Sequence, residues 1–414
     1  MLTISYFNFY LNLRFSGFNE EWEEVKLNEL LTFKNGLNAS KEKYGSGIKF
    51  INVSDILDNE FITYENINDN VQVTDNEFEN YKIEYGDIVF QRSSETMEEV
   101  GTANVYLSKQ PCIYGGFVIR GKKNGNYDPY FLKQLLQSTR VRKEIISWSG
   151  GSTRYNIGQD SLNKISLILP LIEEQQVISK FFCYINKRIQ LLQNKYNSYQ
   201  NFKKYLMQQI FTQKLRFKTK NNENFEEWKE RKLSEILLEH KLKSTGNEEV
   251  YSVSVHKGLV NQVEHLGRIF SAPDTSKYNL VKPGDIVYTK SPTGDFPLGI
   301  IKQSRVEKNV IVSPLYGVFT PETYDLGYIL NDYFESNVNT YNYLHPIVQK
   351  GAKNTMNITN KTFLSRSLFV PTDKTEQHRI AQCLMKFNKY VKLIERHKNQ
   401  IEKFKQGLLQ QMFV

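Results

Sequence analysis

The stretch KKYLMQQIF at residues 203–211 returns 202 positions later as KQGLLQQMF at residues 405–413. The longer segments 181–211 and 383–413 match at the same offset. Landmarks earlier in the chain repeat as well: Leu13-Arg14-Phe15 returns at residues 215–217, and Gly86-Asp87-Ile88-Val89 returns at residues 284–287 with an offset of 198. Offsets that drift and return predict two copies of one unit, with insertions and deletions between fixed landmarks. A chain of 414 residues holds two units of the usual domain size.

The repeated segments carry an apolar heptad pattern. Its positions are Ile178, Phe182, Ile185, Ile189, Leu192, Tyr196, Tyr199, Lys203, Leu206 and Ile210, and the second copy places its counterparts 202 residues later. Lys203 and Lys405 are polar at the same position. A period of 3.5 residues sustained over this length predicts two helices, each roughly 50 Å long, that pair with each other. We expect them to be antiparallel and to hold the globular parts apart, although each helix could instead pack only on its own domain.

The rest of each copy predicts a mixed α/β domain. Strands are expected at residues 48–53, 87–92 and 113–120, with counterparts at 250–255, 285–290 and 310–319. A helix should follow Asp128, and another should lie just after Asp325. Asp373 with Glu376 resembles a capping box at the second long helix. The predicted fold class is therefore α/β, with two mixed α/β domains separated by two long antiparallel helices that form an intramolecular coiled coil.

The predicted boundaries follow from the prolines that precede the helices, Pro170 and Pro371. They give a first domain at 1–170, a first long helix at 171–215, a second domain at 216–371 and a second long helix at 372–414. The net charge of +9 is concentrated in the helical segments, where residues 173–218 contain nine Lys or Arg against two Glu. This excess indicates either attraction to phosphates or an acidic partner, or simply a solvated helix face.

The cysteines and the start of the chain bear on the compartment. Cys112, Cys183 and Cys383 form no Cys-x-x-Cys pair, which argues against a disulfide framework or a thiolate zinc site and is typical of the cytoplasm. The apolar residues 1–15 have no basic region and no small-residue cleavage site, and they are too few to span a bilayer. We interpret them as a disordered or misassigned start, and we expect a cytoplasmic protein.

Two loops in each copy combine glycine, hydroxyl and cationic residues. One follows Gly-Asp-Ile-Val, and the other precedes the last predicted strand of the domain. The candidate DNA-binding residues in these loops are Arg92, Ser93, Ser152, Thr153, Arg154, Tyr155 and Asn156 in the first copy, and Lys290, Ser291, Lys350, Lys353, Asn354 and Thr355 in the second. Arg and Lys can meet phosphate or guanine, Asn can address adenine, and hydroxyls can reach phosphate oxygens. Such loops are also common on ordinary protein surfaces.

Motifs for catalysis are missing. Asp128-Pro129-Tyr130 lacks the second proline of the motif with which amino-methyltransferases hold a flipped base, and there is neither a phosphate loop nor Gly-x-Gly-x-x-Gly. The six histidines have no metal-ligand spacing on one helix face. We therefore expect no catalytic residue, no metal site and no cofactor in this chain.

Two divergent α/β units, each with Gly-Asp-Ile-Val and a Gly-rich basic loop, and each followed by Pro, Glu-Gln and a long helix ending in Gln-Gln-x-Phe, resemble the specificity subunit of type I restriction-modification systems. The resemblance covers nearly the whole chain from Leu13 onward. It implies a non-catalytic, sequence-specific DNA-binding subunit whose two domains each read half of a split, asymmetric target. It also implies that the helices act as a molecular ruler and dock methyltransferase (modification) and restriction subunits, and that S-adenosylmethionine, ATP and magnesium belong to those partners.

Three hypotheses follow from these observations. For a specificity subunit, the two half-sites should differ and should lie about one helical turn apart, ~34 Å in B-DNA. Arg154→Ala or Lys353→Ala should then weaken binding through one half-site only. The first alternative is a coiled-coil scaffold that organises protein partners without DNA readout. A second, an autonomous methyltransferase or nuclease, requires activity from the isolated chain.

Overall fold

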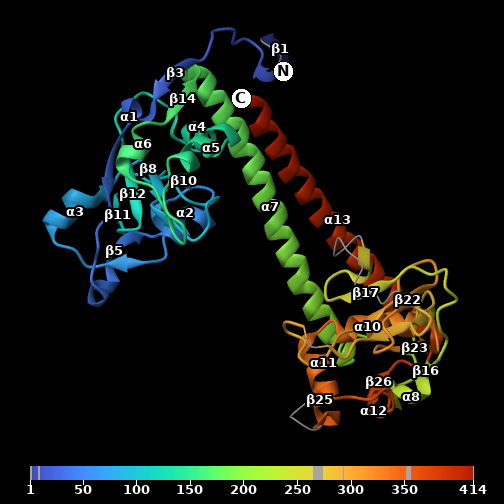
Figure 1. Ribbon diagram of the computed structural model, residues 1–414. Coiled ribbons are helices and arrows are strands. Elements are labelled where there is room, and N and C mark those ends of the chain that lie inside the picture. Colours follow the sequence, from blue (N-terminus) through green and yellow to red (C-terminus); the bar gives the residue numbers. More distant parts are fainter. Residues whose placement is uncertain (1, 8–9, 264–273, 292, 351–355, 414) are drawn as a thin grey trace. The chain divides into compact units, whose positions relative to one another are not determined.

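The structure is a computed structural model that describes residues 2–7, 10–263, 274–291, 293–350 and 356–413 (Figure 1). Its contacts divide the chain into two units, of which the first is Met1–Asn194 with Glu395–Val414 and the second is Lys195–Ile394. This division crosses both long helices. Each unit therefore contains one globular part, a segment of one long helix and a segment of the other. The boundaries predicted from the sequence separate helices from domains instead, and they stay a prediction.

The first globular part contains short helices and strands in alternation. Its strands are β1 Leu2–Phe7, β2 Tyr10–Phe15, β3 Glu23–Lys26, β4 Leu31–Asn35, β5 Tyr44–Ile51, β6 Asn70–Val71, β7 Lys82–Ile83, β8 Ile88–Gln91, β9 Ser93–Ser94, β10 Ala103–Val105, β11 Cys112–Tyr114, β12 Val118–Lys123, β13 Tyr155–Asn156 and β14 Ser166–Leu169. Its helices are α1 Leu27–Leu30, α2 Val53–Asp58, α3 Asp75–Tyr81, α4 Pro129–Leu136, α5 Thr139–Ser147 and α6 Gln159–Leu162. The Asp128 side chain accepts a hydrogen bond from the Phe131 N–H at 2.9 Å, which confirms the predicted start of α4.

The second globular part repeats this order, with fewer elements among its described residues. Its strands are β15 Lys229–Lys232, β16 Leu237–Glu239, β17 Tyr251–Ser254, β18 Gly258–Asn261, β19 Asn279–Val281, β20 Ile286–Tyr288, β21 Ile301–Gln303, β22 Val310–Val312, β23 Gly317–Pro321, β24 Gln349–Lys350, β25 Met356–Asn357 and β26 Ser367–Val370. Its helices are α8 Leu233–Ile236, α10 Tyr324–Phe334, α11 Asn337–Leu344 and α12 Asn360–Phe363. Asp325 lies in the first turn of α10, and Thr323 caps that helix.

The same four-stranded sheet lies at the centre of both units. In the first unit the strand order is β10-β8-β12-β4, and in the second unit the equivalent strands have the order β21-β20-β23-β16. The repeated Gly-Asp-Ile-Val leads into the buried strands β8 and β20. Gly86 has φ +89° and Gly284 has φ +88°, a left-handed conformation that favours glycine. The repeated glycine therefore fixes the same turn twice.

The aspartate of this motif is structural in both units. Asp87 is 1% exposed, and its Oδ2 lies 2.6 Å from Arg120 Nη2. Asp285 is also 1% exposed, and it accepts from Thr320 Oγ1 at 2.8 Å while His240 Nε2 lies 2.8 Å away. Each aspartate thus ties the turn before its strand to neighbouring strands, and neither is available for a ligand.

The two long helices are α7 Ile172–Phe211 and α13 Lys374–Met412 (green and red in Figure 1). In the first unit, the ring of Phe182 stacks on that of Phe413 with centroids 6.0 Å apart, and Lys398 Nζ donates to Gln193 Oε1 at 2.8 Å. Within each unit, rising residue numbers on α7 meet falling numbers on α13. The second unit shows the same direction, because Tyr199 meets Tyr390 and Phe202 meets Phe387, with centroids 5.0 and 5.7 Å apart. The predicted antiparallel pairing is confirmed.

The helices also pack on the globular parts. Ile178, Phe182 and Ile185 of α7 and Leu408 and Met412 of α13 belong to the hydrophobic core of the first unit. The polar break in the heptad pattern has a partner in each unit: Lys405 Nζ lies 3.8 Å from Glu60 Oε2, and Lys203 Nζ lies 2.6 Å from Glu335 Oε2. The alternative that each helix packs only on its own domain is therefore wrong, since both kinds of packing occur.

Three local predictions are corrected. The strands predicted at 113–120 and 310–319 are each broken by a turn, because Gly115-Gly116 interrupts the first and Pro314 the second. A Cβ at Gly116 would come within 1.8 Å of Asn38 Oδ1, so a larger residue in this turn would displace the Asn38 side chain. Asp373 caps α13 by accepting from the Glu376 N–H at 3.0 Å, but the Glu376 carboxylate binds Arg216 instead of completing a capping box.

The start of the chain also differs from the expectation. Strands β1 and β2 pair as an antiparallel hairpin, with Leu2 opposite Phe15, so the interpretation as a disordered start is wrong for these residues. Within the described ranges, none of the helices combines the length and the apolar character that crossing a bilayer requires.

Candidate nucleic-acid interface

The structure brings the two predicted loops of the first unit together. Arg92 and Ser93 follow β8, whose residues are buried, and β9 then pairs with β13 so that Tyr155 lies opposite Ser94 and Asn156 opposite Ser93. The Ser93 hydroxyl donates to the Asn156 side chain. Because β8 is a central strand of the sheet, these polar groups are mounted on a rigid base.

The loop at residues 150–156 turns back on itself beside this strand end. Gly150 and Asn156 exchange backbone hydrogen bonds of 2.8 and 3.0 Å. Gly151 has φ +128°, and a Cβ there would lie 2.0 Å from the Arg154 carbonyl oxygen, so only glycine fits. Ser152, Thr153 and Arg154 form the exposed tip of the loop. The glycine in this loop therefore serves the turn that presents these three side chains.

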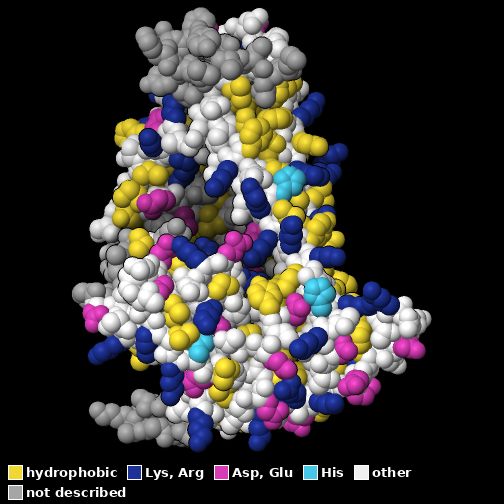
Figure 2. All heavy atoms as spheres, turned by 90° about the vertical axis from the view of Figure 1, so that its right-hand side faces the viewer, with side chains coloured by type: hydrophobic (Ala, Val, Ile, Leu, Met, Phe, Trp, Pro, Cys, Tyr) yellow, Lys and Arg dark blue, Asp and Glu magenta, His cyan; other side chains and the backbone are white. Residues whose placement is uncertain are grey.

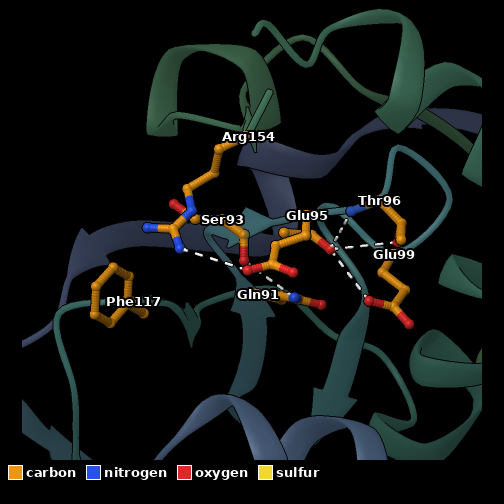
Figure 3. A pocket seen from close by; sticks show the side chains of 8 residues that line it. Gln91, Ser93, Glu95, Thr96, Glu99, Phe117 and Arg154 are labelled. Carbon is orange, nitrogen blue, oxygen red and sulfur yellow. Dashed lines mark hydrogen bonds and ion pairs between the residues drawn. The ribbon is translucent and has the colours of Figure 1, made fainter. Parts of the chain in front are cut away.

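A cavity of about 380 Å³ lies between the two loops (Figure 3). It is lined by Gln91, Ser93, Ser94, Glu95, Thr96, Glu99, Phe117 and Arg154. Figure 3 shows the Arg154 side chain reaching toward Ser93 and Glu95, and Arg154 Nη2 lies 3.9 Å from Glu95 Oε1. Both partners are mostly exposed, at 58% and 84%, so water and salt screen this pair. Arg154 is consequently available to another anion.

Sequence reasoning missed part of this cavity. Glu95 and Glu99 add two carboxylates, and Ser94 Oγ donates to Glu99 Oε2 at 3.1 Å. Gln91 is 3% exposed, and its Oε1 has no hydrogen-bond partner among the described residues. In the sequence, only their position marked these residues. Gln91 directly precedes Arg92, and Glu95 and Glu99 come soon after Ser93. The cavity thus offers acceptors beside one cation, a mixture that suits polar base edges better than phosphates alone.

The second unit presents a parallel set of residues. Lys290 and Ser291 follow β20, and burial lowers the pKa of Lys290 below its ordinary value while Glu239 opposes this. Lys350 ends β24, which pairs with β25 as a short hairpin. Lys353, Asn354 and Thr355 lie outside the described residues. Two of the predicted residues, Lys290 and Ser291, therefore occupy the strand end that Arg92 and Ser93 occupy in the first unit.

Part of the chain is similar to a known domain family. Residues 19–201 match the model of the type I restriction modification DNA specificity domain. This segment of the chain is similar to that domain family. The matched segment includes β3 to β14 and most of α7, and hence all seven candidate residues of the first unit. The predicted resemblance to type I specificity subunits is confirmed.

A curated relative and two solved structures are similar to the chain. The type I restriction enzyme MjaVIII specificity subunit of Methanocaldococcus jannaschii is 24% identical over 210 residues, which are 49% of this chain and 48% of the relative. The match thus spans about half the length of that relative. The S subunit of the type I restriction-modification system from M. genitalium has a TM-score of 0.57 at 13% identity, covering 96% of this chain and 97% of the other.

A second solved chain, described under complex assembly and conformational transition of the type I R-M system, has a TM-score of 0.54 at 14% identity and covers 96% of this chain and 98% of the other. At these identities the two structures show a shared fold. The matched segment and this fold agree with the repeated framework described above, two mixed α/β units with paired long helices. In the described part of the chain, no three His, Cys, Asp or Glu side chains gather as a metal site would require.

Proposed function

We propose that the chain is the sequence-specific DNA-binding subunit of a type I restriction-modification complex and reads a bipartite, asymmetric target. The observation that carries this proposal is one sheet framework built twice with unlike loops on it. Equivalent frameworks present each loop set in the same way, while different side chains give each unit a different base preference. The two half-sites should therefore differ in sequence.

Within each unit, the proposed contacts divide by chemistry. Arg154 is at a loop tip, where its guanidinium can pair with guanine O6 and N7, and Lys353 is predicted to bind phosphate through its ammonium group. Arg92 and Lys290 lie at strand ends, where they would fix the position of the backbone of the DNA. Ser93, Ser152, Thr153, Ser291 and Thr355 would supply hydroxyls, Tyr155 and Lys350 further phosphate contacts, and Asn156 and Asn354 amides for adenine.

We infer that partner subunits dock on the long helices. Leu191 of α7 is 54% exposed, and its counterpart Leu393 of α13 is 50% exposed. Phe202 and Phe404, also 202 positions apart, are 52% and 56% exposed. Leu191 and Phe404 belong to the first unit, whereas Leu393 and Phe202 belong to the second. Two equivalent apolar pairs suit two copies of the same partner, for which we propose methyltransferase subunits.

Apolar and cationic side chains lie together on one face of the molecule (Figure 2). Figure 2 shows one face of the molecule on which yellow hydrophobic side chains lie among dark blue Lys and Arg side chains. An apolar centre within a charged border is the usual composition of a specific interface. Restriction subunits would join through the methyltransferase subunits. We place S-adenosylmethionine, ATP and magnesium in these partners, and catalysis with them.

The test uses the complex of this chain with its methyltransferase subunits. Random-sequence duplexes are incubated with the complex, bound duplexes are enriched over several rounds, and the product is sequenced. The expected result is a motif with two conserved parts of different sequence separated by a spacer of constant length. Binding without any preferred sequence would contradict sequence-specific DNA recognition. It would favour the scaffold hypothesis, in which the same apolar pairs would bind protein partners. A single, symmetric motif would contradict the bipartite, asymmetric target.

A further inference from the structure

One turn in each unit carries a large exposed apolar side chain. Phe117 is 62% exposed in the turn between β11 and β12, and Leu315 is 74% exposed in the turn between β22 and β23. The two residues are 198 positions apart, the offset that also relates the two copies of Gly-Asp-Ile-Val. They therefore occupy one position of the repeated framework.

Both turns are held firmly. The strands on either side are buried, and the Phe117 carbonyl oxygen accepts from the Arg92 N–H at 2.8 Å. In the second unit, the Tyr316 N–H donates to the Ser313 carbonyl oxygen at 3.1 Å, and Gly317 pairs with Tyr288 of the central strand β20. The backbone of such a turn is already ordered before it binds anything, so little backbone conformational entropy is lost on insertion.

The neighbours of these residues are the proposed DNA contacts. Phe117 lines the same cavity as Ser93 and Arg154, and Figure 3 shows its ring at the edge of that cavity. Arg92 Nη1 donates to the Gly116 carbonyl oxygen at 3.4 Å. Lys290 follows β20. That strand pairs with β23, which begins shortly after Leu315. Isolated exposed apolar residues are ordinary on proteins, but two at one framework position, each near a candidate DNA cation, are not explained by chance exposure.

We propose that Phe117 and Leu315 are apolar wedges that insert between neighbouring base pairs, one in each half-site, and bend the DNA. This inference rests on the DNA reading proposed above. A phenyl ring or a branched aliphatic side chain fills the gap that opens when two base pairs unstack, while nearby cations hold the displaced phosphates. Pyrimidine–purine steps unstack most easily, so the wedge adds a preference for such a step at a position where no base edge is read.

The experiment measures DNA bending by the complex with methyltransferase subunits. A duplex enriched by the wild-type complex is labelled at both ends with a fluorescent donor and acceptor, and energy transfer reports its end-to-end distance. The variants are Phe117→Ala, Leu315→Ala and the double variant, with Phe117→Leu as the conservative change. Tyr85→Ala, which removes a 54% exposed side chain in the first unit, and Leu238→Ala, which removes a 73% exposed one in the second, are the matched controls.

Each single alanine variant should remove part of the bend and weaken binding about tenfold, and the double variant should remove most of the bend. Phe117→Leu and both controls should bend DNA like the wild type, and the thermal unfolding of all variants should be unchanged. If the alanine variants bend the DNA as much as the wild type does, the wedge proposal is overturned, whether or not their affinity falls. If the wild-type complex enriches no sequence, the proposed function fails and the wedge with it; if it enriches a motif without bending the duplex, only the wedge fails.

Discussion

Arg14 holds the carboxylate of Glu174 with two nitrogen atoms, Nε at 3.0 Å from Oε1 and Nη2 at 2.5 Å from Oε2. Arg216 holds Glu376 in the same manner, at 3.2 and 3.1 Å. In each pair the partners are 160 residues apart in sequence, and each glutamate lies in the first turn of a long helix. Each pair therefore joins the start of a long helix to the segment that precedes a globular part.

Removing the charge of Glu376 should destabilise the second unit. Its side chain is 1% exposed, and Glu376→Gln would leave the Arg216 guanidinium, 15% exposed, without its buried charged partner. We expect a loss of about 3 kcal/mol in the free energy of unfolding. Hydrogen exchange followed by mass spectrometry checks this, because it reports protection separately for peptides of each unit.

The matched control is Glu227→Gln. Glu227 contacts the same Arg216 at 3.2 Å, but its side chain is 85% exposed, so its replacement should change nothing measurable. Glu174→Gln should act on the first unit by a smaller amount, because Trp228 Nε1 also donates to Glu376 at 3.2 Å, whereas Trp22 Nε1 has no partner in the described part of the first unit. Equal effects of Glu376→Gln and Glu227→Gln would contradict this account.

Acid should weaken the first unit through Glu60. Burial raises the pKa of Glu60, but the positive charges of Lys133 and Lys405 lower it by more than burial raises it. The pKa of Glu60 therefore lies below the ordinary 4.5. A carboxyl group with a lowered pKa stabilises the folded state above its unfolded pKa, and this contribution is lost as the pH falls through the folded pKa. Stability should therefore decrease below about pH 4.5 more steeply in the wild type than in Glu60→Gln.

The readout for Glu60 is the unfolding midpoint in urea as a function of pH, followed by hydrogen exchange in first-unit peptides. Lys133 Nζ lies 2.7 Å from Glu60 Oε1 and its side chain is 2% exposed, so Glu60→Gln should also be less stable than the wild type at pH 7. Parallel pH profiles for the two proteins would exclude Glu60 as the titrating group.

Arg154→Ala should weaken binding through the first half-site alone. If Arg154 contacts a base, binding to the enriched duplex should fall by about 1–3 kcal/mol, and specificity should relax at one position of one half-site. Binding measured by fluorescence anisotropy on the enriched duplex and on random duplexes checks this. Lys109→Ala, which removes an exposed positive charge elsewhere in the same unit, is the control. Equal losses on both duplexes would assign Arg154 to a phosphate instead.

Replacing one of the exposed apolar pairs with aspartates should prevent one methyltransferase subunit from binding. Leu191→Asp with Phe404→Asp changes only the first unit, and Leu393→Asp with Phe202→Asp changes only the second. Native mass spectrometry should show a complex with one methyltransferase subunit for either double variant and with two for the wild type. Leu57→Asp, at a residue 42% exposed in α2, should keep both. Two bound subunits in every variant would contradict docking at these pairs.

The sequence predicted the features that repetition marks. The heptad pattern located both long helices to within a few residues, and the matched Gly-Asp-Ile-Val located both central strands, because these elements have a buried face whose period appears in the sequence. The spacing between the two units stays a prediction. The structure then brings the candidate loops of the first unit together at one strand end.

The features that escaped prediction depend on contacts between distant residues. The turn with Phe117 was missed because residues 113–120 were predicted as one strand. Gly115-Gly116 lies inside an otherwise apolar run there. Glu376 looked like a capping residue, since nothing nearby in sequence reveals Arg216, 160 positions earlier. Glu95 and Glu99 complete the cavity only after β9 and β13 pair. Local periodicity carries no information on such pairings.

The last helix segment of the chain, which is part of the first unit, sets an order of events during protein synthesis. Phe413 packs against Trp22, Phe131 and Phe182, so the core of the first unit lacks a component until Phe413 has been synthesised. The second unit needs no residue beyond Ile394. Although N-terminal domains usually fold first on the ribosome, here the half that is made earlier is completed later.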